Sequence, residues 1–321
     1  MENNKNNKTK LLTDLLNIKY PIILAPMFLV SNVKMLVAAS KVGITGAIPA
    51  LNFRTIEAFE KALIELKEKS VGPFGINLIV NKSNFYYKEQ LAACCKHQVD
   101  YIITSLGSPE ETIIEAHKVG IKVFCDVVDL VYAKKVEALG ADAIIAVNKE
   151  AGGHAGPTSY QELLPLLIKN CNIPIISAGG VGNHEQMEQM LSLGAAGLSI
   201  GSLFIASEES DVSQEYKEAC INYGAKDIVF TTKLSGTKCT IINTPYVQEV
   251  GTEQSGLDQF LNKNKRLKKW YKAFTFYKGM KKLNNAATTN TNKTFWCAGP
   301  SIEYVKEIKP IAAIVNSLVN G

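Results

Sequence analysis

The segment Glu150–Gly156, which reads EAGGHAG, is the part of the chain whose residue types and spacing best suit chemistry. Two adjacent glycines, Gly152 and Gly153, leave the backbone bare, so a flat ligand can lie against it. His154 would project over that ligand, and because an ordinary histidine titrates near neutral pH, it can accept or donate a proton. A loop histidine bonded to a carbonyl is the alternative, but the small neighbours on both sides favour a functional role.

Two glycine-rich segments, 177–182 (SAGGVG) and 199–202 (SIGS), indicate an anion site. Glycine lets backbone N–H groups approach an anion closely, and a helix that follows adds a favourable dipole. Ordinary tight turns also use glycine. The presence of both segments after two successive apolar runs favours phosphate binding.

Two polar residues lie inside apolar runs. Asn77 offers a donor and an acceptor, which suits the N–H/C=O edge of a ring. A bond from Asn77 to a neighbouring strand is equally compatible with the sequence, since a buried amide needs a partner. Asp126 is similar, because it can contact a ligand or bind a backbone amide.

The elements that would position these residues form a recurring unit of a short apolar run, a turn and an amphipathic stretch. Runs that are apolar throughout are typical of parallel strands buried on both faces. The predicted strands are Pro21–Met27, Ile44–Ala50, Phe74–Val80, Asp100–Gly107, Lys122–Val128, Ala143–Asn148, Ile173–Gly179 and Gly197–Ile205. Predicted helices include Arg54–Lys69, Pro109–Val119, Tyr132–Leu139 and Glu185–Leu193.

Eight such units predict an α/β fold, the closed (β/α)8 or TIM barrel. An open doubly wound sheet is disfavoured, because the first run ends in Ala25-Pro26-Met27 where a dinucleotide-binding fold would have G-x-G-x-x-G. In the barrel, active sites lie at the carboxyl ends of the strands, and phosphates bind after strands 7 and 8. The three candidate segments above fall at those ends.

The chain divides into four predicted parts. Residues 1–17 are a flexible N-terminus, 18–206 the cofactor-binding barrel, 207–296 an inserted, mostly helical cap, and 297–321 a closing helix packed on the barrel. Within the cap, Ser207–Tyr223 and Leu257–Leu283 read as helices, Val229–Thr244 as extended or irregular, and Ala286–Lys293 as a polar loop. The amphipathic stretch that would supply the closing helix is Pro300–Val319.

Composition bounds the class of protein. With 321 residues, 46% hydrophobic and 20% charged, the chain is globular, and its 35 basic and 30 acidic residues give no polyelectrolyte character. The polar N-terminus lacks a signal-peptide core, and no apolar run is long enough to span a bilayer. Seven cysteines without CxxC spacing fit a reduced cytoplasmic location and no structural metal.

Several motifs then occur together in order: PIILAPM at 21–27, FGIN at 74–77, GADA at 140–143, EAGGH at 150–154, IISAGGV at 175–181 and GSLF at 201–204. This pattern resembles the nitronate monooxygenase (2-nitropropane dioxygenase) family, whose superfamily includes FMN-dependent enoyl-ACP reductases. The resemblance covers residues 18–206, and WCAGPSIEYVKEI near the end also looks familial.

The resemblance implies an FMN-containing barrel with His154 as the catalytic residue. It implies that Asn77 bonds the flavin and that the glycine turns hold its phosphate. The residues implied to bind the cofactor, together with the candidate Asp126, are Ala25, Pro26, Met27, Asn77, Asp126, Gly152, Gly153, Gly179, Gly180, Ser199, Ile200, Gly201 and Ser202. Two departures concern the substrate: Val147 takes the place of a flavin-contacting Gln, and 235–240 reads SGTKCT where SGRPAR is usual.

The implied activity is oxidation of alkyl nitronates, such as propionate 3-nitronate, by O2 to a carbonyl compound and nitrite. The alternative is an NAD(P)H-dependent flavin reductase acting on enoyl thioesters or quinones. A third hypothesis has the basic, aromatic stretch Lys263–Lys282 binding nucleic acid or a membrane. The favoured interpretation is that its basic residues form a solvated helix face and its aromatic residues pack the cap onto the barrel. We therefore expect small-molecule partners, no nucleic acid and no membrane, with a homodimer as the oligomer considered.

Overall fold

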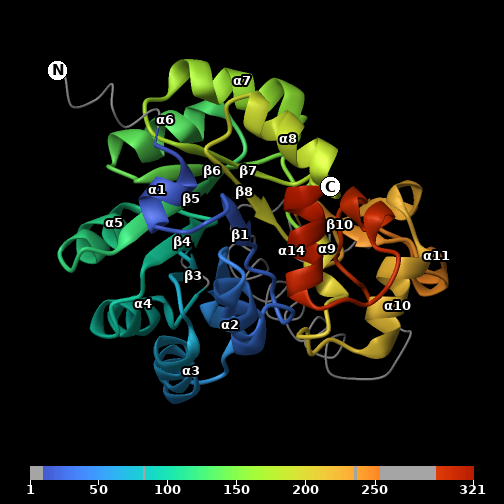
Figure 1. Ribbon diagram of the computed structural model, residues 1–321, viewed down its shortest axis with the longest axis horizontal. Helices are drawn as coiled ribbons and strands as arrows, with labels where there is room; N and C mark the ends of the chain where they lie inside the picture. The colour runs from blue at the N-terminus through green and yellow to red at the C-terminus, as the bar shows by residue number, and fades with distance from the viewer. Residues whose placement is uncertain (1–9, 82–83, 235–236, 254–293) are drawn as a thin grey trace, which may run out of the picture.

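The computed structural model describes residues 10–81, 84–234, 237–253 and 294–321, and its central feature is a closed barrel of parallel strands (Figure 1). β1 pairs with both β2 and β8, so the ring has no free edge. The predicted (β/α)8 barrel is confirmed. The strands are β1 (Ile22–Leu24), β2 (Thr45–Pro49), β3 (Phe74–Ile79), β4 (Tyr101–Ser105), β5 (Lys122–Val127), β6 (Ala143–Val147), β7 (Ile175–Ala178) and β8 (Gly197–Ile200).

The strands are apolar throughout because both of their faces are covered. Outward side chains such as Ile76 and Leu78 meet the helices, while Tyr101 and Phe124 fill the barrel interior. The rings of Tyr101 and Phe124 stack with their centroids 5.0 Å apart. Gly75 makes room for this pair, since a Cβ there would lie 2.2 Å from the Tyr101 ring.

Helices alternate with the strands and lie outside the ring. α3 shows why they form: the Thr55 side chain caps its first turn by accepting from the N–H of Ala58, and Phe59, Leu63 and Leu66 face the barrel. The helices between strands are α2 (Val33–Lys41), α3 (Ile56–Lys69), α4 (Tyr87–Lys96), α5 (Glu110–His117), α6 (Leu130–Ala138), α7 (Tyr160–Asn170) and α8 (His184–Ser192), with a short 3-10 helix η1 (Ala50–Asn52) after β2.

A short helix, α1 (Leu12–Leu16), closes the amino-terminal end of the barrel. Leu12 is fully buried and packs with interior residues such as Ile23. The N–H of Leu12 donates to the carbonyl of Ala196 at 2.8 Å. Within the segment 1–17 that the sequence predicts to be flexible, residues 12–16 thus form a helix with two buried leucines, because the barrel interior provides a tertiary apolar site that the local sequence does not reveal.

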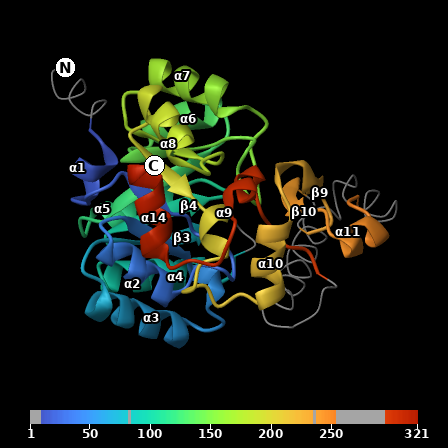
Figure 2. The ribbon, with the colours of Figure 1, turned by 45° about the vertical axis from the view of Figure 1, so that its right-hand side comes forward.

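The chain leaves the barrel after β8 and forms a side unit (Figure 2). Its described elements are α9 (Ser202–Ile205), α10 (Gln214–Asn222), η2 (Ala225–Asp227), β9 (Ile228–Thr231), β10 (Cys239–Ile242) and α11 (Pro245–Val250). β9 and β10 form an antiparallel pair where the sequence indicated only extended or irregular chain. The helix predicted over Ser207–Tyr223 begins only at Gln214, because Ser213 caps it. The stretches expected at Leu257–Leu283, Lys263–Lys282 and Ala286–Lys293 lie outside the described residues.

The chain ends on the barrel. The stretch Pro300–Val319 is not one helix but two elements, η3 (Pro300–Tyr304) and α14 (Ile311–Asn320), because Pro310 cannot continue a helix from its amino-terminal side. α14 packs against α2 and α8, and the Nδ1 of His184 lies 2.8 Å from the carbonyl oxygen of Leu318. α14 therefore lies between α2 and α8, the first and last helices of the barrel.

Among the residues that the structure describes, none of the helices has the length and apolarity needed to cross a bilayer. Within the same residues, no group of three His, Cys, Asp or Glu side chains is arranged to hold a metal ion.

Candidate active site

A cavity of about 1460 Å³ lies at the carboxyl ends of the barrel strands, between the barrel and the side unit. Its floor is formed by residues at or just after the strand ends, including Asn77 of β3, Val147 of β6 and Ala178 of β7. Every site residue proposed from the sequence lines this cavity, from Ala25 after β1 to Ser202 after β8. Ligand pockets commonly measure ~300–1,000 Å³, so there is room for a large ligand and a second molecule beside it.

The loop that carries His154 is held from two sides. The N–H of Thr240, in β10, donates to the carbonyl of Gly153 at 2.8 Å, and the Thr240 hydroxyl donates to the carbonyl of Ala151 at 3.0 Å. On the other side, a Cβ on Gly152 would lie 3.0 Å from the backbone nitrogen of Gly299. The side unit therefore fixes the loop, and the glycines allow the three chain segments to approach closely.

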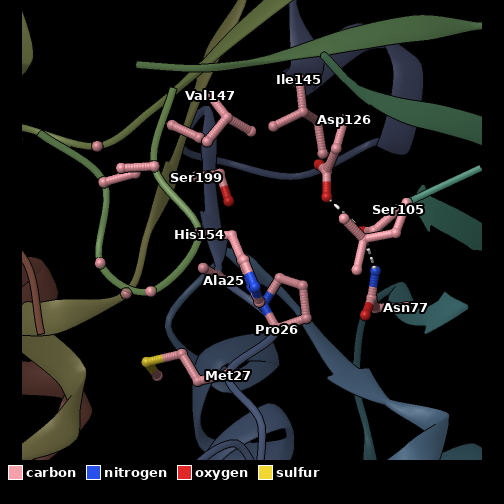
Figure 3. Close-up of a pocket in the computed structure, with 18 of the residues that line it drawn as sticks. Ala25, Pro26, Met27, Asn77, Ser105, Asp126, Ile145, Val147, His154 and Ser199 are labelled. Atoms are coloured by element: carbon pink, nitrogen blue, oxygen red, sulfur yellow. Dashed lines mark hydrogen bonds between the residues drawn. The ribbon is translucent and has the colours of Figure 1, made fainter. Parts of the chain in front are cut away.

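The His154 side chain points into the middle of the cavity, between the Ala25–Met27 segment and the strand ends of β5 and β6 (Figure 3). The ring is exposed to the cavity, yet the surrounding walls exclude enough solvent to lower its pKa below the ordinary histidine value. At neutral pH the ring is therefore uncharged, with one nitrogen able to accept a proton and the other able to donate.

The turn after β7 has the features of a phosphate cradle. Gly179 and Gly180 adopt φ values of +105° and +86°, and a Cβ on Gly179 would lie 2.4 Å from the backbone nitrogen of Ala151. In the described part of the chain, no protein acceptor binds the backbone N–H groups of Gly180 and Val181, although Val181 is buried. Both residues line the cavity, so their N–H groups can donate to the phosphate of a nucleotide-like cofactor.

The first and last strands complete this side of the cavity. The Ser31 hydroxyl donates to the carbonyl of Ala25 at 2.9 Å and accepts from the N–H of Met27 at 2.8 Å, which fixes the Ala25–Met27 turn. A Cβ on Gly201 would lie 3.3 Å from the Met27 sulfur. The Ser202 hydroxyl accepts from the N–H of Gly299 at 2.9 Å. One wall of the cavity is thus formed by the segments that follow the first and last strands of the barrel, together with the returning chain.

On the opposite side, three polar side chains from neighbouring strands form a hydrogen-bonded series (Figure 3). Asn77 donates through Nδ2 to the Ser105 hydroxyl at 2.8 Å and to the carbonyl of Ile103 at 3.1 Å. Ser105 donates to Asp126 Oδ2 at 2.5 Å. Burial raises the pKa of Asp126 to about 6, although the bond from Ser105 acts to lower it. Both alternatives considered for Asn77 are therefore present, since it bonds a neighbouring strand and lines the cavity.

Sequence reasoning missed Ser105 and the contributions of the side unit. Ser105 is the last residue of β4, and Asn77 and Asp126 lie near the ends of β3 and β5. Its position at a strand end could have identified it as a candidate site residue. The side unit contributes Leu234, Lys238 and Cys239 to the cavity lining, and the chain that returns to the barrel contributes Phe295 and Cys297. No local pattern could assign them, because tertiary packing alone brings them over the barrel. Val147, at the departure noted above, lines the cavity with Ile145.

Comparisons with known proteins agree with this architecture. A family model described as nitronate monooxygenase matches residues 81–321. A probable nitronate monooxygenase of Staphylococcus aureus is 28% identical over 298 residues, covering 79% of this chain and 83% of that protein. A hydroxy-methyl-oxo-octahydro-indene-carboxyl-CoA dehydrogenase of Rhodococcus jostii is 28% identical over 245 residues, covering 76% and 68%.

Two solved structures share the fold. FabK from Thermotoga maritima has a TM-score of 0.83 at 28% identity, covering 96% of this chain and 94% of that chain. A nitroalkane oxidase from Streptomyces ansochromogenes has a TM-score of 0.80 at 21% identity, covering 96% of both chains. Since the family model spans most of the chain, the protein belongs to the nitronate monooxygenase family of flavin-dependent oxidoreductases.

Proposed function

We propose that this protein binds FMN and oxidises alkyl nitronates, such as propionate 3-nitronate, with O2 to a carbonyl compound and nitrite. The observation that carries the proposal is the convergence, in one cavity, of His154 with a glycine turn that leaves two backbone N–H groups available to an anion. The cavity volume of about 1460 Å³ accommodates a cofactor and a small substrate together.

The position of each residue in the cavity indicates which part of the cofactor it would bind. Gly179, Gly180 and the segment Ser199–Ser202 would hold the phosphate, Ala25–Met27 and Gly152 would flank the ring, and Asn77 would bond its polar edge. Bound FMN would supply the redox chemistry. The protein would bind the substrate beside the ring and restrict access of water.

His154 acts on the substrate. A nitronate is already deprotonated, so the neutral ring donates a hydrogen bond to a nitro oxygen and stabilises its negative charge. With a neutral nitroalkane, the same ring accepts the proton from the carbon that carries the nitro group. The lowered pKa of His154 suits this second task, because the ring is unprotonated at neutral pH.

The test uses purified protein loaded with FMN. Propionate 3-nitronate, supplied without NAD(P)H, should cause oxygen uptake and nitrite release. A colourless preparation that takes up no FMN would refute the cofactor assignment. Turnover that occurs only with NAD(P)H would refute nitronate oxidation.

A second candidate function is NAD(P)H-dependent reduction of an enoyl thioester or a quinone. It is favoured by the outer part of the cavity, where Phe85, Leu106 and Tyr132 are 86%, 45% and 57% exposed and could cover an apolar chain. The likeness to FabK and to a CoA-ester dehydrogenase supports the same alternative. NAD(P)H oxidation with crotonoyl-CoA, and separately with quinones, distinguishes it from the first candidate.

A further inference from the structure

We propose that Asp126 and Ser105 are positioning residues that act with the backbone carbonyl of Ile103 to make Asn77 present its carbonyl oxygen, and therefore a hydrogen-bond acceptor, to the ligand in the cavity. The inference rests on the proposed function in one respect only, that FMN is the ligand. Its structural basis is the series Asn77–Ser105–Asp126 (Figure 3).

The direction of the two hydrogen bonds follows from the charge on Asp126. An ionised carboxylate can only accept, so Ser105 must donate its single hydroxyl proton to Asp126 Oδ2, 2.5 Å away. The Ser105 oxygen is then left as an acceptor, and Asn77 must turn its amino group toward it, at 2.8 Å.

The second N–H of Asn77 is also used, because it donates to the carbonyl of Ile103 at 3.1 Å. Asn77 is buried, lines the cavity, and has only its Oδ1 remaining to face the ligand. The bound group must therefore offer an N–H or O–H at this point. The isoalloxazine ring of FMN carries such a group in its pyrimidine N–H.

The surroundings of Asp126 place the titration of its carboxyl group within an accessible pH range. Its partner in register on β6 is the apolar Ile145, and its neighbour on β4 is Ser105. The other ionisable groups that line the cavity are Cys125 on the same strand, Tyr132 and Lys135 from α6, Glu150 and His154 after β6, and Tyr216, Lys238, Cys239 and Cys297 from the chain after β8. Burial raises the pKa of Cys125 to about 12, so this thiol stays neutral. Burial also raises the pKa of Asp126 to about 6.

A ligand that donates to Asn77 should therefore favour ionised Asp126, and by linkage its affinity should fall as pH decreases through the Asp126 pKa. The FMN phosphate also titrates near pH 6, so the wild-type profile alone does not isolate Asp126. The variant Asp126→Asn provides the matched control, because it retains the shape and an acceptor oxygen but loses the titration.

The experiment measures the FMN dissociation constant by flavin fluorescence between pH 5 and 8. Between pH 6 and 5, we expect the wild type to weaken by up to about tenfold more than Asp126→Asn, the limit for one linked proton. At pH 7.5, Ser105→Ala should weaken FMN binding about tenfold through the lost hydrogen bonds. Ser105→Thr should restore most of the affinity, and Ser317→Ala, at an exposed serine of α14 outside the cavity, should leave it unchanged.

A second readout needs no cofactor. The infrared band of the protonated carboxyl, taken as wild type minus Asp126→Asn, should appear as pH falls through about 6, and at higher pH in Ser105→Ala. Coincident FMN profiles for wild type and Asp126→Asn, or an Asp126 band that does not respond to Ser105→Ala, would overturn the proposal. Loss of FMN binding in all proteins, wild type included, would instead refute the proposed function.

Discussion

His154 is the residue whose chemistry differs most between the two forms of the proposed substrate. Desolvation by the cavity walls lowers its pKa, so the neutral form is present at neutral pH and is lost only as pH falls through that lowered value. A neutral nitroalkane needs the ring as a base, whereas a preformed nitronate needs it only as a donor.

We therefore predict an acidic limb in the pH profile of kcat/KM for a neutral nitroalkane, with a midpoint below the ordinary histidine pKa of ~6.5. The preformed nitronate should show no such limb from His154, because the protonated ring still donates. Steady-state oxygen uptake with both forms checks this. Identical acidic limbs for the two would show that His154 is not the base.

Replacement of the imidazole gives a second prediction at this scale. His154→Ala should retain bound flavin but lose ~10²–10⁴-fold in turnover of the nitroalkane, the usual contribution of a positioned acid–base group. His154→Gln keeps a donor but no base, so it should retain more activity with the nitronate than with the nitroalkane. The flavin absorbance serves as the control for an intact site, and unchanged turnover in His154→Ala would remove this residue from the mechanism.

At the scale of elements, the strand β10 of the side unit holds the loop that carries His154. Thr240 makes this connection through its backbone N–H and its hydroxyl. Thr231, on the neighbouring strand β9, provides a matched control. Both threonines are buried, but the Thr231 hydroxyl donates to the carbonyl of Thr252 at 2.7 Å, away from the loop.

The Thr231 hydroxyl also accepts from the N–H of Lys233, and the Thr240 hydroxyl also lies 3.3 Å from the carbonyl of Gly153. Because each hydroxyl makes two hydrogen bonds, Thr240→Val and Thr231→Val should each cost ~1–3 kcal/mol of unfolding free energy. Only Thr240→Val should also lower kcat, by several-fold, because it loosens the loop under His154. Chemical denaturation and steady-state kinetics separate the two effects. Equal kinetics in both variants would mean that the Thr240 hydroxyl does not control the loop.

The glycine turn after β7 allows a similar comparison. Gly179 and Gly120 both have positive φ, +105° and +79°, but a Cβ at Gly120 meets nothing within 4 Å, whereas at Gly179 it meets the Ala151 nitrogen at 2.4 Å. Gly120→Ala should cost ~1–2 kcal/mol from backbone strain alone and leave FMN affinity unchanged. Gly179→Ala should be less stable still and bind FMN at least about tenfold more weakly, as measured by fluorescence titration.

For the whole molecule, the barrel separates stability from chemistry by placing them at opposite ends. Leu12 of α1 is fully buried at the amino-terminal end, while the preceding Leu11 is 48% exposed. Leu12→Ala should cost ~2–5 kcal/mol of unfolding free energy, as for other large-to-small core changes, and Leu11→Ala within ~0.5 kcal/mol of zero. FMN affinity of both folded proteins should match the wild type. A large loss of affinity in Leu12→Ala would show that the two ends are coupled.

The barrel and its candidate site could be predicted from the sequence, because both depend on local patterns. Runs such as Phe74–Ile79 are apolar throughout only when both faces of a parallel strand are covered. The rule that sites lie at strand ends then brought Asn77, His154 and the turn at Gly179 into one region, and the structure places them in one cavity.

The partners of these residues could not be predicted from the sequence, because they come from distant parts of the chain. Leu12 follows a polar N-terminal segment, yet its side chain packs in the barrel interior. Thr240 forms a hydrogen bond with Ala151, which lies 89 residues away in the sequence. The role of Ser105 follows from the pairing of β3, β4 and β5, which places it between Asn77 and Asp126. The hydrophobic pattern predicts whether a side chain is buried. It does not predict which distant segment the side chain packs against, because that depends on how the closed ring and the returning chain pack in three dimensions.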